Sequence, residues 1–258
     1  MSRKVAIITG AGSGVGRALA VMLATEGAAL VVTGRSKEPL EELQRELEGK
    51  ADVAVVVADI TGKDTPQKLV STAMERYDRL DYLVNNAGIG KPVPVDETTD
   101  ELLDMYLNVL LRGPFRLCRE ALTVMQDGAA IVNVASTAAM IGILRSGAYA
   151  AAKAGLVGLS KHMAAQYGPR GIRTNVVAPG VLETPMTAYA WESARFRRMN
   201  FDMTPLNRTG TAEDAAAAIA FLLSDAARFI TGQVIAVDGG WSATKFLSEE
   251  AATAVPLG

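Results

Sequence analysis

The sequence predicts an α/β fold in which a doubly wound, parallel sheet of about seven strands carries helices on both faces. Short runs rich in β-branched residues alternate along the chain with amphipathic stretches of helical period. The runs are apolar at most positions, as strands buried between two helical layers must be. Alternating units of this kind imply parallel strands joined by right-handed crossovers.

Seven runs are expected to form the strands of this sheet: Val5–Thr9, Ala29–Thr33, Val53–Ala58, Tyr82–Asn85, Ala130–Ala135, Thr174–Ala178 and Val234–Val237. The amphipathic stretches between them predict helices near residues 15–27, 37–48, 64–78, 100–126, 148–168 and 212–224. Because no linker, repeat or low-complexity segment interrupts this pattern, we expect a single domain over residues 1–258.

One stretch departs from the alternation. Residues 183–210 contain no clear strand and are rich in Met and aromatic side chains. So long an irregular segment in a compact domain is usually a lid or a binding loop, and we expect it to cover the substrate. A long tail at residues 241–258 follows the last strand, and such a tail either reaches across a subunit interface or frays.

The composition excludes several classes of function. A formal net charge of −2 provides no basic face for nucleic acid, and no run of 18 apolar residues predicts a membrane span. The single cysteine, Cys118, excludes an internal disulfide framework and suits a reducing cytoplasm. The single histidine, His162, leaves no metal-ligand cluster, and we expect both residues to be structural.

The loop after the first strand, Thr9–Gly16, reads TGAGSGVG. The common dinucleotide pattern G-x-G-x-x-G fails in both registers, because it requires glycine where Val15 or Arg17 stands. The loop nevertheless lies where parallel sheets bind ligands, and its glycines would let backbone N–H groups approach a pyrophosphate. A plain tight turn is the alternative interpretation.

Tyr149 and Lys153 stand at i and i+4, and therefore on one face of a predicted helix. A free phenol has a pKa of about 10, and a nearby cation favours the phenolate and lowers that pKa. Beside a ligand site, such a pair can exchange a proton with an alcohol or a carbonyl compound. An exposed contact between the two side chains on a surface helix is the alternative.

Together with these two motifs, several further ones resemble the short-chain dehydrogenase/reductase family over Val5 to Gly240. The matching positions are the T-G-x-x-x-G-x-G loop at 9–16, Asp59, N-N-A-G at 85–88, Asn108, Ser136, Y-x-x-x-K at 149–153, P-G-x-x-x-T at 179–184 and the segment 230–240. Many relatives carry a serine where this chain has Ala135. The resemblance implies a Rossmann-like, NAD(P)-binding domain and an alcohol dehydrogenase or carbonyl reductase.

The resemblance also implies a role for each catalytic residue. Tyr149 would be the general acid/base, Lys153 would lower its pKa and hold the nicotinamide ribose, and Ser136 would hydrogen-bond the carbonyl oxygen. Asn108 would hold a water that links Lys153 to solvent. The implied cofactor-binding residues are Gly10, Ser13, Gly14, Val15, Gly16, Arg35, Ser36, Asp59, Ile60, Asn86, Ala87, Gly88, Tyr149, Lys153, Pro179, Gly180, Thr184 and Met186.

The end of the second strand indicates the cofactor. NAD-binding relatives carry an acidic residue there for the ribose 2′-hydroxyl, and by alignment with the family that position is Gly34. Arg35 offers a cation for a 2′-phosphate and Ser36 a hydroxyl. We therefore expect NADP(H) to be preferred, with NAD(H) possible. A solvated Arg35 is the alternative, and Ser13 stands where many NADP-binding relatives have a second basic residue.

The apolar side chains of 183–210 favour a hydrophobic or ring-containing alcohol or ketone, unless they only pack the lid or a subunit contact. Arg195, Arg197 and Arg198 are expected on a solvated helix face, with contact to an anionic group as the alternative, and Arg145 lies on a loop that borders the substrate in relatives. The competing hypotheses are a 3-oxoacyl thioester reductase, acting on acyl carrier protein or CoA derivatives, and a catalytically silent NAD(P)-binding regulatory protein. The family resemblance further implies a homotetramer.

Overall fold

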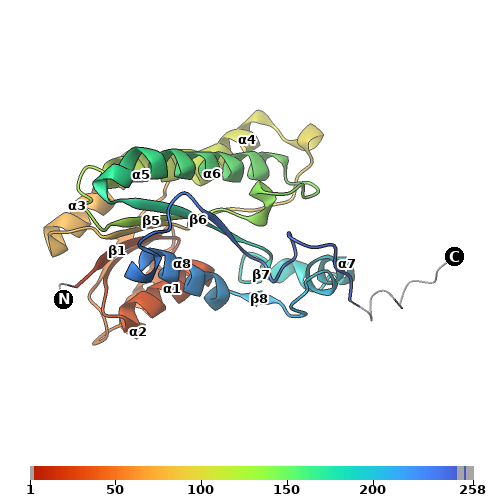
Figure 1. Ribbon diagram of the computed structural model, residues 1–258, viewed down its shortest axis with the longest axis horizontal. Helices are drawn as coiled ribbons and strands as arrows, with labels where there is room; N and C mark the ends of the chain where they lie inside the picture. Colours follow the sequence, from red (N-terminus) through yellow and green to blue (C-terminus); the bar gives the residue numbers. More distant parts are fainter. Residues whose placement is uncertain (1–2, 249–252, 254–258) are drawn as a thin grey trace.

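In a computed structural model, which describes residues 3–248 and residue 253, seven parallel strands form one sheet in the order β3-β2-β1-β4-β5-β6-β9 (Figure 1). The strands are β1 Val5–Thr9, β2 Ala29–Gly34, β3 Val53–Val57, β4 Tyr82–Asn85, β5 Ala130–Val134, β6 Arg173–Pro179 and β9 Val234–Val237. The predicted fold class is confirmed, and each strand begins and ends within one residue of the predicted position.

Helices cover both faces of the sheet (Figure 1). One layer holds α1 Gly14–Thr25, α2 Lys37–Glu46 and α8 Ala212–Leu223; the other holds α3 Thr65–Tyr77, α4 Asp100–Leu107, α5 Gly113–Ala121 and α6 Gly147–Tyr167. Successive residues of β1 serve the two layers: Ile8 packs with Leu19 of α1, whereas Ile7 packs with Leu69 of α3. Because side chains alternate across a strand, both faces of β1 must be apolar.

The order of the strands reverses between β1 and β4, which pair with each other in parallel at the centre of the sheet. Crossovers from β1 run toward β3 on one side, and those from β4 run toward β9 on the other. In a doubly wound sheet, ligands bind beyond the carboxyl ends of the strands at this reversal. The loops after Thr9 and Asn85 meet there.

The helix expected over residues 100–126 is instead two helices joined by a π-helical turn, Asn108–Arg112. An uninterrupted α-helix would need an N–H donor at Pro114 for the carbonyl of Leu110, and proline has none. Pro114 lies in the first turn of α5, where the missing donor costs least. The single-helix prediction was therefore wrong at this point.

The 183–210 segment differs from its prediction at its two ends. β7 (Leu182–Glu183) pairs in parallel with β8 (Gly210–Thr211), although no strand was expected there. Between them lie a 3-10 turn at Ala188–Ala190, the short helix α7 at Ala194–Arg197 and a π-helical turn at Arg198–Asp202. Of the predicted tail at 241–258, residues 249–252 and 254–258 lie outside the described residues.

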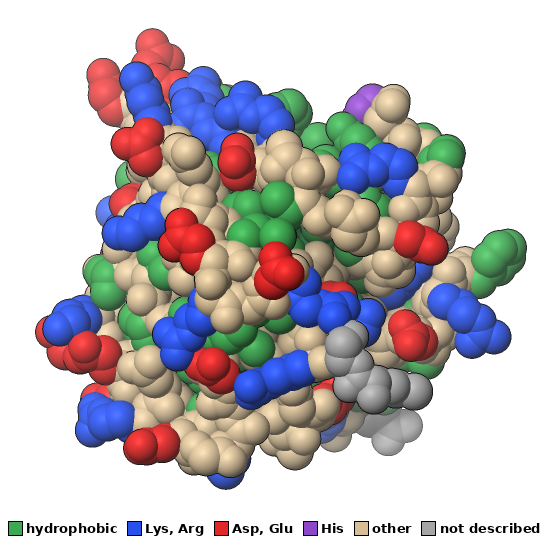
Figure 2. All heavy atoms as spheres, turned by 90° about the vertical axis from the view of Figure 1, so that its left-hand side faces the viewer, with side chains coloured by type: hydrophobic (Ala, Val, Ile, Leu, Met, Phe, Trp, Pro, Cys, Tyr) green, Lys and Arg blue, Asp and Glu red, His purple; other side chains and the backbone are tan. Residues whose placement is uncertain are grey.

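Short 3-10 turns complete the chain at Val95–Glu97, Thr137–Ala139, Gly168–Arg170 and Asp225–Ala227. Among the described helices, none is long and apolar enough to cross a membrane. On the face shown in Figure 2, Lys and Arg side chains are interspersed with Asp and Glu side chains. This mixture agrees with the small net charge of the chain.

Candidate active site

The glycine loop between β1 and α1 is packed too closely for a side chain at Gly10 or Gly16. A Cβ atom on Gly10, whose φ is +66°, would lie 2.9 Å from the Cα atom of Ala87, and one on Gly16 would lie within contact distance of the carbonyl oxygen of Gly10. The N-cap residue Ser13 makes no side-chain capping bond, and the first turn of α1 holds no acidic residue. The loop therefore leaves the amide end of α1 open to an anion.

Thr9 and Asn86 clamp this loop to the end of β4. The hydroxyl oxygen of Thr9 accepts hydrogen bonds from the backbone N–H groups of Asn86 and Ala87, both at 2.9 Å. The side-chain amide of Asn86 donates back to the carbonyl oxygens of Thr9 at 2.9 Å and Gly10 at 3.2 Å. The glycine loop and the N-N-A-G motif, which lie far apart in the sequence, are thus hydrogen-bonded to each other at the point where strand order reverses.

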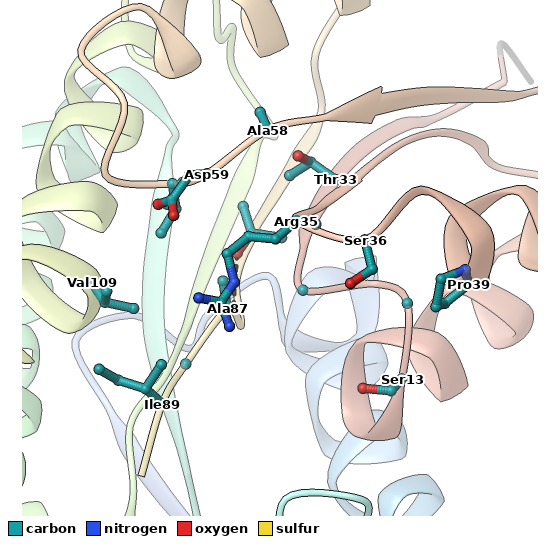
Figure 3. A pocket seen from close by; sticks show the side chains of 16 residues that line it. Ser13, Thr33, Arg35, Ser36, Pro39, Ala58, Asp59, Ala87, Ile89 and Val109 are labelled. Atoms are coloured by element: carbon teal, nitrogen blue, oxygen red, sulfur yellow. Dashed lines mark hydrogen bonds between the residues drawn. The ribbon is translucent and has the colours of Figure 1, made fainter.

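A cavity of about 240 Å³ lies beside the loop, over the ends of β2 and β3. Figure 3 shows the Arg35 side chain in this cavity, with Asp59 on one side of it and Ser13 and Ser36 on the other. The Asp59 carboxylate accepts two hydrogen bonds from Thr61, which lower its pKa, and the charge of Arg35 adds to this effect. Within residues 3–248, the Arg35 side chain has no carboxylate within ion-pair distance.

A second cavity, of about 790 Å³, brings together Ser136, Tyr149 and Lys153. Ser136 follows β5 and caps the turn 137–139 through a 3.2 Å hydrogen bond from the N–H group of Ala138. Tyr149 lies in the first turn of α6, and its ring packs edge-on against Tyr106 with centroids 6.3 Å apart. The Nζ atom of Lys153 lies 5.9 Å from the centre of the Tyr149 ring.

Burial sets the protonation of this group. Burial lowers the pKa of Lys153 to about 8. Burial raises the pKa of Tyr149, and a hydrogen bond with Ser136 offsets part of that rise. The predicted lowering of the tyrosine pKa is therefore absent here, because removal of the phenolate from water outweighs the hydrogen bond. At neutral pH Tyr149 carries its proton.

Other residues expected at the cofactor divide between the two cavities. Ile60 lines the smaller one; Gly14, Val15, Pro179, Gly180, Thr184 and Met186 line the larger one; and Gly10, Ser13, Ala87 and Gly88 line both. Asn86 also borders the larger cavity, although its amide is held by the glycine loop. Gly180 also leaves no room for a side chain, because a Cβ atom there would lie 2.8 Å from the Cβ atom of Asp238.

Asn108 and Gly16 line neither cavity. The backbone oxygen of Asn108 accepts a hydrogen bond from Gly113, and its side-chain oxygen accepts one from Arg112 at 2.5 Å. Cys118 is buried, accepts a hydrogen bond from Asn85 and belongs to the core packed against α5. This burial agrees with the structural role expected for Cys118.

Sequence reasoning did not predict two sets of hydrogen bonds at the larger cavity, those of Thr187 and that of Trp241. The Thr187 hydroxyl donates to the backbone oxygen of Leu182 and accepts from the indole N–H of Trp191 at 3.2 Å. The Trp241 indole donates to the backbone oxygen of Met199 at 2.8 Å. The aromatic content of 183–210 was a signal for Trp191, but Trp241 contacts a residue 42 positions away, and no local pattern indicates that contact.

The two cavities together fit a nicotinamide dinucleotide. They share the wall formed by the glycine loop and the loop after β4, and seven glycines stand on their combined lining at 10, 12, 14, 34, 88, 90 and 180. Backbone donors and serine hydroxyls lie near the loop, where phosphates bind, and a phenol and an ammonium group lie beyond it. Fold and site define an NAD(P)-dependent oxidoreductase.

Comparison with known proteins identifies the family. The sequence model of a family described as Enoyl-(Acyl carrier protein) reductase matches residues 10–242. The 3-oxoacyl-[acyl-carrier-protein] reductase FabG of Thermotoga maritima is 40% identical over 240 residues, which cover 92% of this chain and 97% of that protein. Cis-4-hydroxycyclohexanecarboxylate dehydrogenase of Sinomonas cyclohexanicum is 38% identical over 246 residues, covering 94% and 98%.

Among solved structures, a blue fluorescent protein from a metagenomic library in complex with NADPH has a TM-score of 0.86 and 34% identity, covering 93% of this chain and 98% of that one. The chain belongs to the short-chain dehydrogenase/reductase family. Its relatives are named dehydrogenases and reductases, so it is an enzyme that binds NAD(P)(H) and acts on a small molecule. A catalytically silent protein is not supported.

Proposed function

We propose that this enzyme uses NADP(H) to interconvert a secondary alcohol and a ketone, with Tyr149 as the general acid/base. One observation carries the proposal: Ser136, Tyr149 and Lys153 border a single cavity, and that cavity shares the glycine-loop wall with the cavity that holds Arg35. The proton-transfer groups and the phosphate-binding groups are therefore parts of one continuous site.

The chemistry of proton transfer follows from these side chains. A bound nicotinamide cofactor supplies the hydride for reduction and accepts it for oxidation. During reduction, Ser136 donates a hydrogen bond to the substrate carbonyl oxygen, and Tyr149 transfers its phenolic proton to that oxygen as the carbon–oxygen π bond breaks. Burial keeps Tyr149 protonated at neutral pH, which suits the acid role, and oxidation reverses the transfer.

Lys153 and Asn108 support this transfer. Lys153 is held by a hydrogen bond to the backbone of Val134, and its charge stabilises the phenolate that remains after reduction. Asn108 begins the π-helical turn that packs against α6. We place Asn108 at the far end of a water-mediated path that returns a proton to Tyr149.

NADP(H) is proposed over NAD(H) because the smaller cavity holds Arg35, a cation with no carboxylate partner among residues 3–248. Gly34 provides no carboxylate to repel a 2′-phosphate, while Arg35 and Ser36 offer a guanidinium and a hydroxyl. Asp59 is already engaged by Thr61. Comparison of kcat/KM for the two cofactors tests this preference, and a value with NADH equal to that with NADPH would contradict it.

A hydrophobic, ring-containing substrate suits the larger cavity. Its wall includes Ile89, Ile143, Leu144, Met186, Tyr189, Phe196, Met199 and Trp241. Four of these come from 183–210, so we propose that this segment is the substrate lid. The relative named for cis-4-hydroxycyclohexanecarboxylate carries a ring alcohol in its name, which supports this class.

A 3-oxoacyl thioester is the second candidate substrate, because a relative 40% identical is named a 3-oxoacyl-[acyl-carrier-protein] reductase. Acetoacetyl-CoA separates the two candidates. Turnover of this thioester without turnover of cyclic ketones would favour the second function over the first.

We also propose a homotetramer in the cytoplasm. Exposed apolar side chains gather at two places suited to subunit contacts: Leu103, Met105 and Phe115 on α4 and α5, and Phe221, Phe229 and Ile235 around α8 and β9. The reduced, buried state of Cys118 suits a cytoplasmic protein. Sedimentation of the purified protein tests the assembly, and a monomer would contradict it.

The central experiment follows NADPH absorbance with a panel of cyclic and aromatic ketones, for the natural protein and Tyr149→Phe. Loss of general acid catalysis lowers kcat by about 10²- to 10⁴-fold. Tyr167→Phe, at the other end of α6, is the matched control and should keep full activity. Unchanged turnover in Tyr149→Phe would remove the proposed role of this residue.

A further inference from the structure

The larger cavity has an unusual balance of charge. Four cationic residues line it, Lys91, Arg145, Lys153 and Arg195, while no aspartate or glutamate stands among its lining residues within the described part of the chain. The chain as a whole carries a formal net charge of −2. The site therefore gathers positive charge on a protein that has a small excess of negative charge.

The four cations differ in how far they are already engaged. Lys153 is buried and hydrogen-bonded to Val134, as part of the proton-transfer group. Arg145 lies 3.8 Å from the Glu97 carboxylate. Within residues 3–248, neither Lys91 nor Arg195 has a carboxylate within ion-pair distance, and both are exposed at the cavity.

The two free cations come from different segments. Lys91 lies in the loop after β4, whose backbone is fixed by hydrogen bonds of the Lys91 N–H and C=O groups to the Tyr106 hydroxyl. Arg195 lies on α7, next to Phe196, which also lines the cavity. Both residues line the same cavity, so both add positive potential to it, and the apolar lining can receive the rest of a bound anion.

We propose that the substrate of this enzyme carries a carboxylate, and that Arg195, assisted by Lys91, binds that carboxylate at the mouth of the larger cavity. The inference rests on the proposed function and deepens it, from a ring-containing ketone or alcohol to an anionic one. The guanidinium suits this role because its planar N–H groups match both oxygens of a carboxylate.

Neighbouring residues give the test a matched control. Arg197 lies on the same short helix as Arg195 but does not line the cavity. Arg195→Gln and Arg197→Gln each remove one positive charge from α7, so they have a similar effect on the overall electrostatic potential of the protein. Only Arg195→Gln removes the proposed carboxylate contact, and Lys91→Gln removes its assistant.

Two ketones of nearly equal shape are the probes: 4-oxocyclohexanecarboxylate and its uncharged amide, 4-oxocyclohexanecarboxamide. We expect Arg195→Gln to raise KM for the carboxylate about tenfold with kcat little changed, as for a lost bond to a charged group outside the reacting atoms. KM for the amide should stay unchanged in this variant, and both values should stay unchanged in Arg197→Gln. Added salt should raise KM for the carboxylate alone.

The outcomes separate the two proposals. Equal kcat/KM for the two ketones, or an equal effect of Arg195→Gln on both, would overturn the carboxylate site while the ketone reductase function stands. Turnover of neither ketone would contradict the ring-ketone function.

Trp241 lines the cavity, so quenching of tryptophan fluorescence by cyclohexanecarboxylate measures anion binding without turnover. Quenching that is no weaker in Arg195→Gln than in the natural protein would also overturn the site.

Discussion

The Nζ atom of Lys153 donates a 2.6 Å hydrogen bond to the backbone oxygen of Val134, which ties α6 to the carboxyl end of β5. The lysine is only 4% exposed. Its ammonium group is therefore held at a fixed place, and it bears the cost of burial there.

This burial predicts a dependence of stability on pH. The pKa of Lys153 falls from an ordinary value of 10.5 to about 8 on folding, so the folded state binds fewer protons than the unfolded state between those pH values. Its contribution to the free energy of unfolding should therefore rise as pH rises from about 8 to 10.5, by about 3 kcal/mol. Below pH 8 the charged group destabilises the fold.

Urea unfolding of the natural protein and Lys153→Met at pH 7 and pH 10 measures this contribution. The stability of the natural protein relative to the variant should increase with pH. Burial raises the pKa values of Tyr77 and Cys118 to about 12, so these two groups lower the stability as pH rises. They do so in both proteins, and their contributions cancel in the difference. Parallel curves for the two proteins would contradict the prediction.

Arg35 should decide between the two cofactors. Arg35→Ala is expected to lower kcat/KM for NADPH about tenfold or more and to leave the value for NADH nearly unchanged, since a guanidinium–phosphate contact is charge-assisted. Lys37→Ala removes a nearby exposed cation that pairs with Glu41 instead, and it serves as the control. An equal loss with both cofactors would place Arg35 outside the 2′-phosphate site.

Thr187 should hold the base of the 183–210 segment. Its hydroxyl bonds Leu182 and Trp191, so Thr187→Val keeps the shape of the side chain and removes these bonds. We expect kcat/KM to fall about tenfold, mainly through KM, because the cavity wall is less well positioned. Thr72→Val, on α3, a helix that lines neither cavity, removes a similar hydroxyl bond and should leave the kinetics unchanged.

Cys118 should react slowly with thiol reagents in the folded protein. Burial raises its pKa to about 12, which leaves little of the reactive thiolate at neutral pH. Labelling with a chromogenic disulfide should become fast only in denaturant, with a midpoint that matches the loss of helical signal. Rapid labelling of the native protein would show that the core around α5 opens readily.

The sheet could be predicted because each strand is a continuous apolar run. Ile7 and Ile8 must both be apolar when the strand faces two helical layers, and that requirement is visible in a single sequence. The glycine loop and the Tyr149–Lys153 pair could also be predicted, because their chemistry depends on the spacing of residues close together in the chain.

Other features depend on contacts that leave no local pattern. β7 and β8 have two residues each, too few for any period, and they pair only because the chain returns after 26 residues. The π-helical turn at Asn108–Arg112 keeps helical residues throughout, so its altered hydrogen bonding is hidden. The direction of the Tyr149 pKa shift depends on burial, which spacing alone does not report.

The pairing of β7 with β8 has a consequence for how this enzyme can change. The two strands hold the ends of the intervening stretch side by side, so residues 184–209 form a closed loop whose ends stay in place whatever its sequence. Doubling the length of such a closed loop costs only about 0.6 kcal/mol in chain entropy. The loop between these two strands can therefore vary in length at little cost in chain entropy, while Thr184 and Met186, which line the larger cavity, stay next to the end of β7.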